Sequence, residues 1–332
     1  MKIPFCDLRR GNEPLRQDIQ RAIEACLDRS SYLRGPETAA FEEEWADYCG
    51  QRYAVCCNSG TDALTLAVSA LGMTTATVQA NTLALTGIGL SRGGASVTIA
   101  DVNADGALVE VTDDAVPVLI FGHLPSPEQL RAPLFDAAHA HGWKPPMQAA
   151  AAWSFYPTKS LGALGDAGAI TTNDPALAEE MRHLAGRDDQ LRSRRQITSR
   201  TDEIQAAVLR VKLRHLDAWL AERAAIAAAY HERLKPLGVT LDSPSLHHLY
   251  VIRVERRDGM HRYLQDNGID SKIHWKDPLH RLDGPWTAVG GFPGAEAWCR
   301  SVLSLPCFPG LQAYEIERIC DLVETFIDAN PE

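Results

Sequence analysis

Lys159 is the side chain in this sequence whose surroundings most favour nucleophilic chemistry. It lies in residues 154–168, which pass from a short aromatic segment into a proline turn and then into a loop punctuated by glycines. Its neighbours in that stretch include four large apolar residues, Tyr156, Pro157, Leu161 and Leu164. Because loss of solvent lowers the pKa of an amine, a lysine enclosed in this way is a candidate for Schiff-base chemistry. A surface lysine whose stem covers apolar neighbours is the alternative.

The turn at Ser59, Gly60 and Thr61 is a candidate anion site. It follows a predicted strand at residues 53–57 and opens a predicted helix with apolar residues at helical spacing. The first N–H groups of a helix lack partners within it and lie at the positive end of its dipole, so they attract phosphate. An ordinary helix cap made by the same hydroxyl side chains is the alternative.

Asp136 follows a short apolar run at residues 133–135, which predicts a buried strand. In sheets of parallel strands, ligands bind beyond the carboxyl ends of the strands, where this acid would lie. The residues after it are small, which leaves room for a flat ligand. The anion turn, Asp136 and Lys159 therefore supply, in that order, what pyridoxal phosphate needs: a phosphate cup, a carboxylate for the ring nitrogen and a lysine for the aldehyde.

The elements that must position these residues predict an α/β fold. Short apolar runs alternate with helical or loop segments, which is typical of a mostly parallel sheet flanked by helices. The strands expected in this sheet are residues 53–57, 77–79, 96–100, 116–121, 133–135 and 169–172. Residues 202–237 read as a long helical region that bridges to a small C-terminal α+β domain, with strands at 249–254, 271–275 and 302–305. We expect a cofactor-binding large domain at residues 1–220 and a small domain at 221–332.

Composition excludes several classes of protein. The chain has 332 residues and a formal net charge of −10 that is spread along its length, so we expect no nucleic-acid partner. No apolar run approaches membrane-spanning length and the N-terminus lacks a signal-peptide core, which predicts a soluble, cytoplasmic protein without a membrane partner. The eight cysteines show no C-x-x-C pair and no metal-ligand spacing, so we expect reduced thiols and no metal site.

The sequence resembles the DegT/DnrJ/EryC1/StrS sugar aminotransferases, which are fold-type I pyridoxal phosphate enzymes. The resemblance covers nearly the whole chain. The matching motifs are PFCDL at residues 4–8, GPE at 35–37, SGTDAL at 59–64, DAAHAHG at 136–142, the run at 154–168, RTDEIQAAVL at 200–209, IHWKDPLH at 273–280 and LSLP at 303–306.

The resemblance implies a role for each cofactor residue. Lys159 would hold the cofactor and move the proton, Asp136 would pair with the ring nitrogen, and His139 would contact the ring oxygen unless it is a satisfied core histidine. Four residues would surround the phosphate: Ser59, Gly60, Thr61 and Ser154. A loop of the second subunit of a homodimer would complete the site. Two positions depart from the family pattern, since Leu83 stands where a ring-covering aromatic or histidine is usual, and Thr198 where a phosphate-binding asparagine is usual.

The resemblance also implies the reaction. We expect an aminotransferase that moves an amino group from an amino acid, glutamate in the first instance, to a keto sugar nucleotide of the 3-keto-6-deoxyhexose kind. Four residues are expected to face the substrate: Tyr156, His274, Lys276 and His280. A keto-cyclitol or another ketone is an alternative acceptor. Leu83, Thr198 and the shortened segments on either side of Asp136 keep open a second alternative, a non-catalytic cofactor-binding or regulatory protein.

Overall fold

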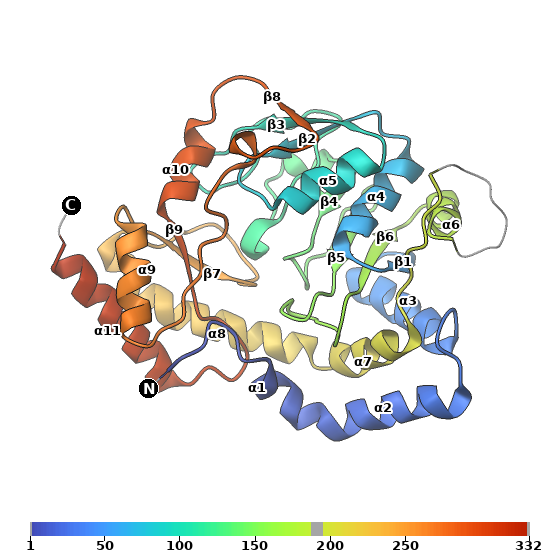
Figure 1. Ribbon diagram of the computed structural model, residues 1–332, viewed down its shortest axis with the longest axis horizontal. Helices are drawn as coiled ribbons and strands as arrows, with labels where there is room; N and C mark the ends of the chain where they lie inside the picture. Colours follow the sequence, from blue (N-terminus) through green and yellow to red (C-terminus); the bar gives the residue numbers. More distant parts are fainter. Residues whose placement is uncertain (1, 187–194, 331–332) are drawn as a thin grey trace.

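A mostly parallel sheet forms the centre of the structure, a computed structural model that describes residues 2–186 and 195–330 (Figure 1). One part of the sheet has the strand order β1-β6-β5-β4 and the other the order β2-β3-β8. Only β6 runs antiparallel to its neighbours. The strands are β1 (Tyr53–Cys57), β2 (Thr75–Gln79), β3 (Ser96–Ala100), β4 (Leu134–Asp136), β5 (Ala150–Ser154), β6 (Gly168–Thr172) and β8 (Trp286–Ala288).

Residues 114–119 join the two parts of the sheet. Val116 N–H donates to the Thr77 carbonyl on β2, and the Pro117 carbonyl accepts from Asp136 N–H on β4. The expected strand at residues 116–121 is therefore wrong in extent, since only isolated parallel bridges form at Ala115 and Val118. Proline has no N–H to donate to a ladder, and the chain turns into a 3₁₀ helix at Ile120–Gly122 directly afterwards. The segment nonetheless places Asp136 in the middle of a continuous sheet.

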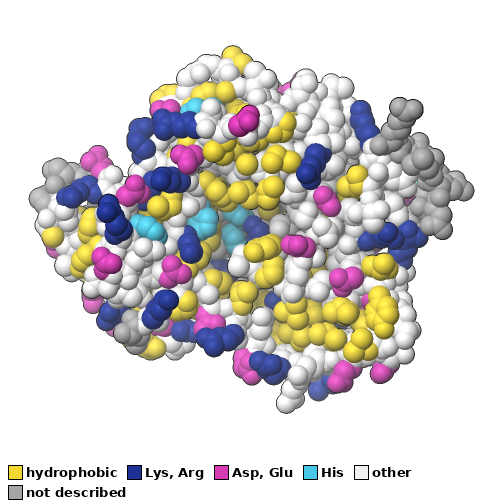
Figure 2. Space-filling model, viewed as in Figure 1, with side chains coloured by type: hydrophobic (Ala, Val, Ile, Leu, Met, Phe, Trp, Pro, Cys, Tyr) yellow, Lys and Arg dark blue, Asp and Glu magenta, His cyan; other side chains and the backbone are white. Residues whose placement is uncertain are grey.

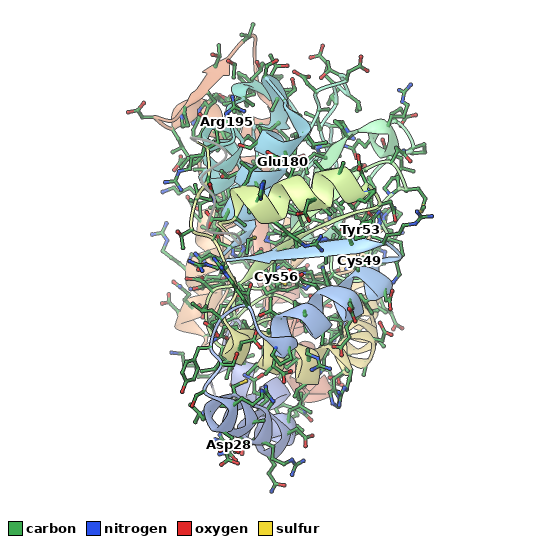
Figure 3. All side chains as sticks on the ribbon, turned by 90° about the vertical axis from the view of Figure 1, so that its right-hand side faces the viewer. Asp28, Cys49, Tyr53, Cys56, Glu180 and Arg195 are labelled. Atoms are coloured by element: carbon green, nitrogen blue, oxygen red, sulfur yellow. The ribbon has the colours of Figure 1, made fainter. Side chains whose placement is uncertain are left out.

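Helices cover both faces of this sheet. On β1, Val55 and Cys57 pack into the core beneath α4 (Gly60–Leu71), while Ala54 and Cys56 pack into the core beneath α3 (Pro36–Cys49), as the two-residue period of a strand requires. Figure 3 looks at this edge: α6 (Pro175–Leu184) lies on one side of β1 and α3 lies on the other. The remaining helices against the sheet and its cover are α5 (Ala84–Arg92), α7 (Glu203–Leu213), α2 (Arg16–Arg29) and α1 (Leu8–Asn12).

The C-terminal elements form a smaller α+β unit with a core of its own, seen on the left of Figure 1. Its two strands, β7 (Tyr250–Arg253) and β9 (Val302–Leu305), pair antiparallel. The helices around them are α8 (Leu216–Leu234), α9 (Arg257–Asp266), α10 (Pro293–Ser301) and α11 (Ala313–Asp328). Short 3₁₀ helices complete the inventory: Glu13–Leu15, Ile120–Gly122, Gln129–Arg131, Lys235–Leu237 and Leu279–Arg281.

The α/β architecture expected from the sequence is confirmed. Residues 123–133, which lead into β4, contain only the 3₁₀ turn Gln129–Arg131, and the bridging helical region divides into α7 and α8. The expected strand at residues 271–275 is reduced to one bridge between Lys272 and Ser304. Two segments cross the boundary drawn after residue 220: Ile3 packs in the C-terminal core, and β8 pairs with β3 of the large sheet.

The structure bears on the state of the cysteines and on the character of the helices. All eight cysteines are free, and seven of them are buried. Across residues 2–186 and 195–330, none of the helices combines the length and the apolar character that crossing a membrane requires.

Candidate active site

A cavity of about 360 Å³ opens at the carboxyl ends of the central strands. It brings together three groups that are far apart in the sequence: the turn at residues 59–61, Asp136 at the end of β4, and Lys159 just after β5. Leu83 and Tyr156 stand at its rim, 38% and 53% exposed. Figure 2 shows histidine side chains gathered in a hollow at the centre of this face, with apolar side chains above and below it.

Lys159 is presented by a tight loop. Its N–H donates to the Tyr156 carbonyl, and Gly162 approaches the loop so closely that a Cβ there would lie 2.3 Å from the Pro157 carbonyl oxygen. The buried Lys212 ammonium donates to the Gly162 carbonyl and so ties this loop to α7. Burial lowers the pKa of Lys159 to about 8, while the nearby Asp136 opposes that shift. The fraction of free amine at neutral pH is therefore raised from far below 1% to roughly 10%.

Asp136 is 5% exposed and held by neutral donors. Thr86 Oγ1 donates to its Oδ2 at 2.8 Å, and Ala138 N–H donates to its Oδ1 at 3.1 Å. Burial raises the pKa of Asp136, and the two hydrogen bonds and the charge of Lys159 act against that rise. A buried carboxylate with no bonded cation among the described residues favours a positively charged group beside it.

The turn at residues 59–61 forms the N-terminus of α4. Ser59 Oγ accepts from Asp62 N–H and caps the helix, so the capping role is observed, and the phosphate-binding role of the turn stays a prediction. Gly60 lies against β5, where a Cβ would come within 2.9 Å of the Ser154 Cβ. The turn is fixed from behind by Ser199, which accepts from Asn58 N–H and donates to the Asp62 carboxylate.

Lys159 also lines a second cavity, of about 270 Å³, on the side of the C-terminal unit. His139 lines this second cavity rather than the first. Phe121 N–H donates to its Nδ1 at 3.1 Å, which places the proton of the neutral ring on Nε2. Burial, followed by the charge of Lys159, holds the pKa of His139 well below its usual range. His139 is thus a neutral ring beside the lysine, anchored to the backbone at one nitrogen.

The predicted substrate residues do not all come together. Tyr156 lines the first cavity, and His274 lines the second, where its Nδ1 lies 2.9 Å from Ser304 Oγ. His280 lines neither, since it pairs with Glu296 at 3.2 Å and stacks on Phe292. Lys276 is exposed and lines neither cavity. Thr198 is likewise exposed and outside both, so its expected role toward a partner subunit stays a prediction.

Sequence reasoning missed the side chains that hold the site in place. Thr86 on α5 binds Asp136, Ser199 holds the turn at residues 59–61, and Lys212 on α7 holds the loop that carries Lys159. Each comes from an element remote in sequence, and serine and threonine are residue types too common to stand out. The sequence did offer one signal, because Lys212 in α7 and Arg223 in α8 stand among apolar positions of their helices. Buried cations are rare, so such positions are candidates for a role in a site.

The residues present fit pyridoxal phosphate. The helix N-terminus suits a phosphate, and glycine at position 60 lets the backbone approach it. Asp136 lines the cavity as a buried carboxyl group, which a positively charged ring nitrogen beside it would stabilise in its ionised form. The pKa of Lys159 is lowered, which makes its amine more nucleophilic at neutral pH. Leu83 and Leu85 offer apolar surface at the rim.

Comparison with known proteins agrees with this geometry. Residues 14–115 and 132–324 match the DegT/DnrJ/EryC1/StrS aminotransferase family. The chain is 39% identical to the erythromycin biosynthesis sensory transduction protein EryC1 of Saccharopolyspora erythraea, over 96% of this chain and 98% of that one. It is 36% identical to the dTDP-3-amino-3,4,6-trideoxy-alpha-D-glucose transaminase of Streptomyces venezuelae, over 98% and 97% of the two chains.

Solved structures give the same result. The crystal structure of DesV from S. venezuelae superposes with a TM-score of 0.89 at 35% identity and covers 98% of both chains. A DegT DnrJ EryC1 StrS aminotransferase from Brucella abortus superposes with a TM-score of 0.87 at 29% identity, over 98% of this chain and 99% of that one. With the sequence match, the superposition and the lysine–aspartate cavity in agreement, this chain belongs to the DegT/DnrJ/EryC1/StrS family of pyridoxal phosphate-dependent aminotransferases.

Proposed function

We propose that the protein transfers an amino group from an amino acid, glutamate in our assignment, to the 3-keto carbon of a nucleotide-linked deoxysugar. The observation that carries this proposal is Lys159, which lies between a cavity suited to the cofactor and a second cavity large enough for a small substrate. The S. venezuelae relative, whose name contains a 3-amino sugar nucleotide, supports the choice of substrate.

Pyridoxal phosphate, when bound, supplies an aldehyde that can take up an amino group and a ring that draws electrons from the reacting carbon. Lys159 would hold it, and Asp136 would keep a proton on its ring nitrogen. The N–H groups of Gly60 and Thr61, with the Ser154 hydroxyl, would hold its phosphate.

Lys159 is also the group placed to move protons. Its pKa of about 8 lies near neutral pH, where an amine can both accept and return a proton. The neighbouring imidazoles stay neutral: burial lowers the pKa of His274 to about 4, and burial also lowers the pKa of His139. They therefore do not compete with Lys159 for the proton, and they leave it as the acid–base group of the site.

We also assign the protein to a homodimer in the cytoplasm. Leu83, Leu85 and Tyr156 form an exposed apolar rim around the first cavity, 38%, 47% and 53% exposed, which a second subunit would cover. Thr198 would then reach the partner's cofactor. The free cysteines suit a reducing compartment. Light scattering combined with size-exclusion chromatography should give twice the chain mass of 36.4 kDa, and a monomer would contradict the assignment.

The first half of the amino transfer, from the amino acid to the cofactor, provides a direct test of the proposed activity. Purified protein loaded with pyridoxal phosphate and mixed with glutamate should lose the visible absorbance band of the aldehyde form and gain that of the amine form. Adding a 3-keto sugar nucleotide should reverse the change and produce an amino sugar nucleotide, detected by its mass. Lys159→Ala is the control, and conversion at the wild-type rate in this variant would refute the assignment of Lys159.

A non-catalytic role on the same scaffold is the second candidate. The relative at 39% identity is named a sensory transduction protein, and Leu83 and Thr198 depart from the family pattern. Bound cofactor that fails to convert with any amino donor would favour this role. Retention of Lys159, Asp136 and Ser154 around one cavity favours the enzyme.

A further inference from the structure

Arg223 on α8 is a buried cation without an ion-pair partner among the described residues. It is 4% exposed, and it lines the second cavity, which Lys159 also lines. Its Nη1 donates to the carbonyls of His248 and Cys307, at 3.0 and 2.5 Å. Its Nε is buried and has no hydrogen-bond partner in the part of the chain that the structure describes. A carboxylate binds the Nε–Nη2 edge of a guanidinium through two parallel hydrogen bonds, and in Arg223 this edge makes no hydrogen bond to residues 2–186 or 195–330.

Two other arginines of the described residues are paired with carboxylates. Arg257, which is also 4% exposed, lies 2.6 Å from the Asp258 carboxylate, and Arg10 lies 2.6 Å from Glu315. Burying a guanidinium without an anion is costly, so an unpaired one beside a cavity indicates that an anion completes it.

The charge of the second cavity agrees with an anionic ligand. Its lining contains two further cations, Lys159 and Lys272, and no carboxylate. The imidazoles of His139, His248 and His274 also line it, and burial lowers the pKa of each, so they are neutral at pH 7. The wall facing Lys159 is therefore positive overall, and its neutral rings add hydrogen-bonding groups without adding charge.

We propose that the Nε–Nη2 edge of Arg223 binds a carboxylate of the amino acid donor, with Lys272 as a second cation for a dicarboxylate such as glutamate. This inference rests on the proposed aminotransferase function and names the residue that would select its donor. The cavity measures about 270 Å³, below the roughly 300–1,000 Å³ of sites for drug-sized ligands, so a five-carbon dicarboxylate suits it better than a sugar nucleotide. Arg223 acts here as a donor-binding residue beside Lys159.

Glutarate, which has the two carboxylates of glutamate but no amino group, is the probe. Its affinity for the cofactor-loaded protein would be measured by calorimetric titration in wild type and in Arg223→Gln. Loss of a bidentate, charge-assisted contact should weaken glutarate binding about 10- to 100-fold. Arg233→Gln is the matched control, because Arg233 lies on the same helix but pairs with Asp321 and Glu324 outside the cavity, and it should leave glutarate affinity unchanged.

Two further binding measurements distinguish a donor carboxylate from a nucleotide phosphate, and keep the proposal testable if Arg223→Gln does not fold. Thymidine diphosphate should bind Arg223→Gln and wild type equally, and a parallel loss of its affinity would overturn the assignment to the donor. Lys272→Glu, at an exposed position, should weaken glutarate about 3- to 10-fold even if Arg223→Gln fails to fold. Glutarate affinity that is unchanged in Lys272→Glu, or in folded Arg223→Gln, would also overturn the proposal.

Kinetics distinguish this proposal from the proposed function. In Arg223→Gln the glutamate KM should rise while the KM of the keto sugar nucleotide stays constant. An unchanged glutamate KM with intact amino transfer would reject the role of Arg223 and leave the aminotransferase standing. Absence of conversion in wild type with every donor would reject the aminotransferase, whereas the glutarate titration would still report on Arg223.

Discussion

Replacing Lys212 with methionine should remove a specific pH dependence of stability. Lys212 is 4% exposed, its ammonium donates to the Gly162 carbonyl, and burial lowers its pKa from 10.5 to about 8. Between these two values the unfolded chain holds a proton that the folded protein lacks. The free energy of unfolding must therefore rise with pH across this window, by about 1.4 kcal/mol per pH unit, and the unfavourable contribution is complete below pH 8.

The magnitude follows from the interval chosen for the measurement. From pH 8 to pH 9.5, wild type should gain about 2 kcal/mol in free energy of unfolding relative to Lys212→Met. Urea unfolding of both proteins at pH 7, 8 and 9.5 and constant ionic strength measures this difference. The thiols and Lys159 titrate in both proteins, so their contributions cancel when the two are compared. Lys235→Met is the matched control, since Lys235 is exposed and should behave as wild type.

The same variant also tests how the lysine loop is held. Methionine keeps the apolar stem but leaves the Gly162 carbonyl without its donor, which should cost about 1–3 kcal/mol and loosen the loop that carries Lys159. Curves of wild type and Lys212→Met that run parallel from pH 7 to 9.5 would refute the reasoning, because they would mean that Lys212 keeps its ordinary pKa in the folded protein.

Four further outcomes are expected. Asp136→Asn should still bind the cofactor but slow the absorbance change with glutamate about 100-fold or more, measured by stopped flow, since an amide cannot keep the ring nitrogen protonated. Gly60→Ala places a methyl group 2.9 Å from the Ser154 Cβ and should weaken cofactor affinity roughly tenfold in a fluorescence titration. The rate at which cofactor-free protein captures pyridoxal phosphate should rise with pH through about 8, where Lys159 loses its proton, and a flat profile would contradict the lowered pKa. Glu203→Ala removes the acceptor of four hydrogen bonds at the start of α3 and should lower the free energy of unfolding by about 3 kcal/mol in urea titrations.

The position of the candidate site could be predicted because its main residues lie in short motifs that are recognisable in the sequence. The turn at residues 59–61, Asp136 and Lys159 each lie at or just after the carboxyl end of a strand, and the carboxyl ends of parallel strands meet at one edge of a sheet. The supports could not be predicted, because Thr86 and Ser199 reach the site only through tertiary packing. Their residue types carry no local signal of that contact.

Residues 274–280 are close in sequence but do not all lie at the candidate site. His274 lines the second cavity, whereas His280, six positions on, pairs with Glu296 on α10. Strand β8 and the start of α10 lie in a stretch rich in glycine and proline, residues 283–294. Strand β8 has three residues and two of them are exposed, so its pairing depends on β3 rather than on its own sequence pattern.

The position of β8 has a consequence for how the chain is made. It pairs with β3 through Val97 and Trp286, 189 positions apart in the sequence, and covers the outer edge of the large sheet (Figure 1). During synthesis, all other strands of that sheet leave the ribosome before this one. The edge of β3 is thus an unpaired template for association until residues 286–288 emerge. A ribosome-bound chain whose emerged part ends before β8 should therefore recruit chaperones more strongly than one whose emerged part extends past α10.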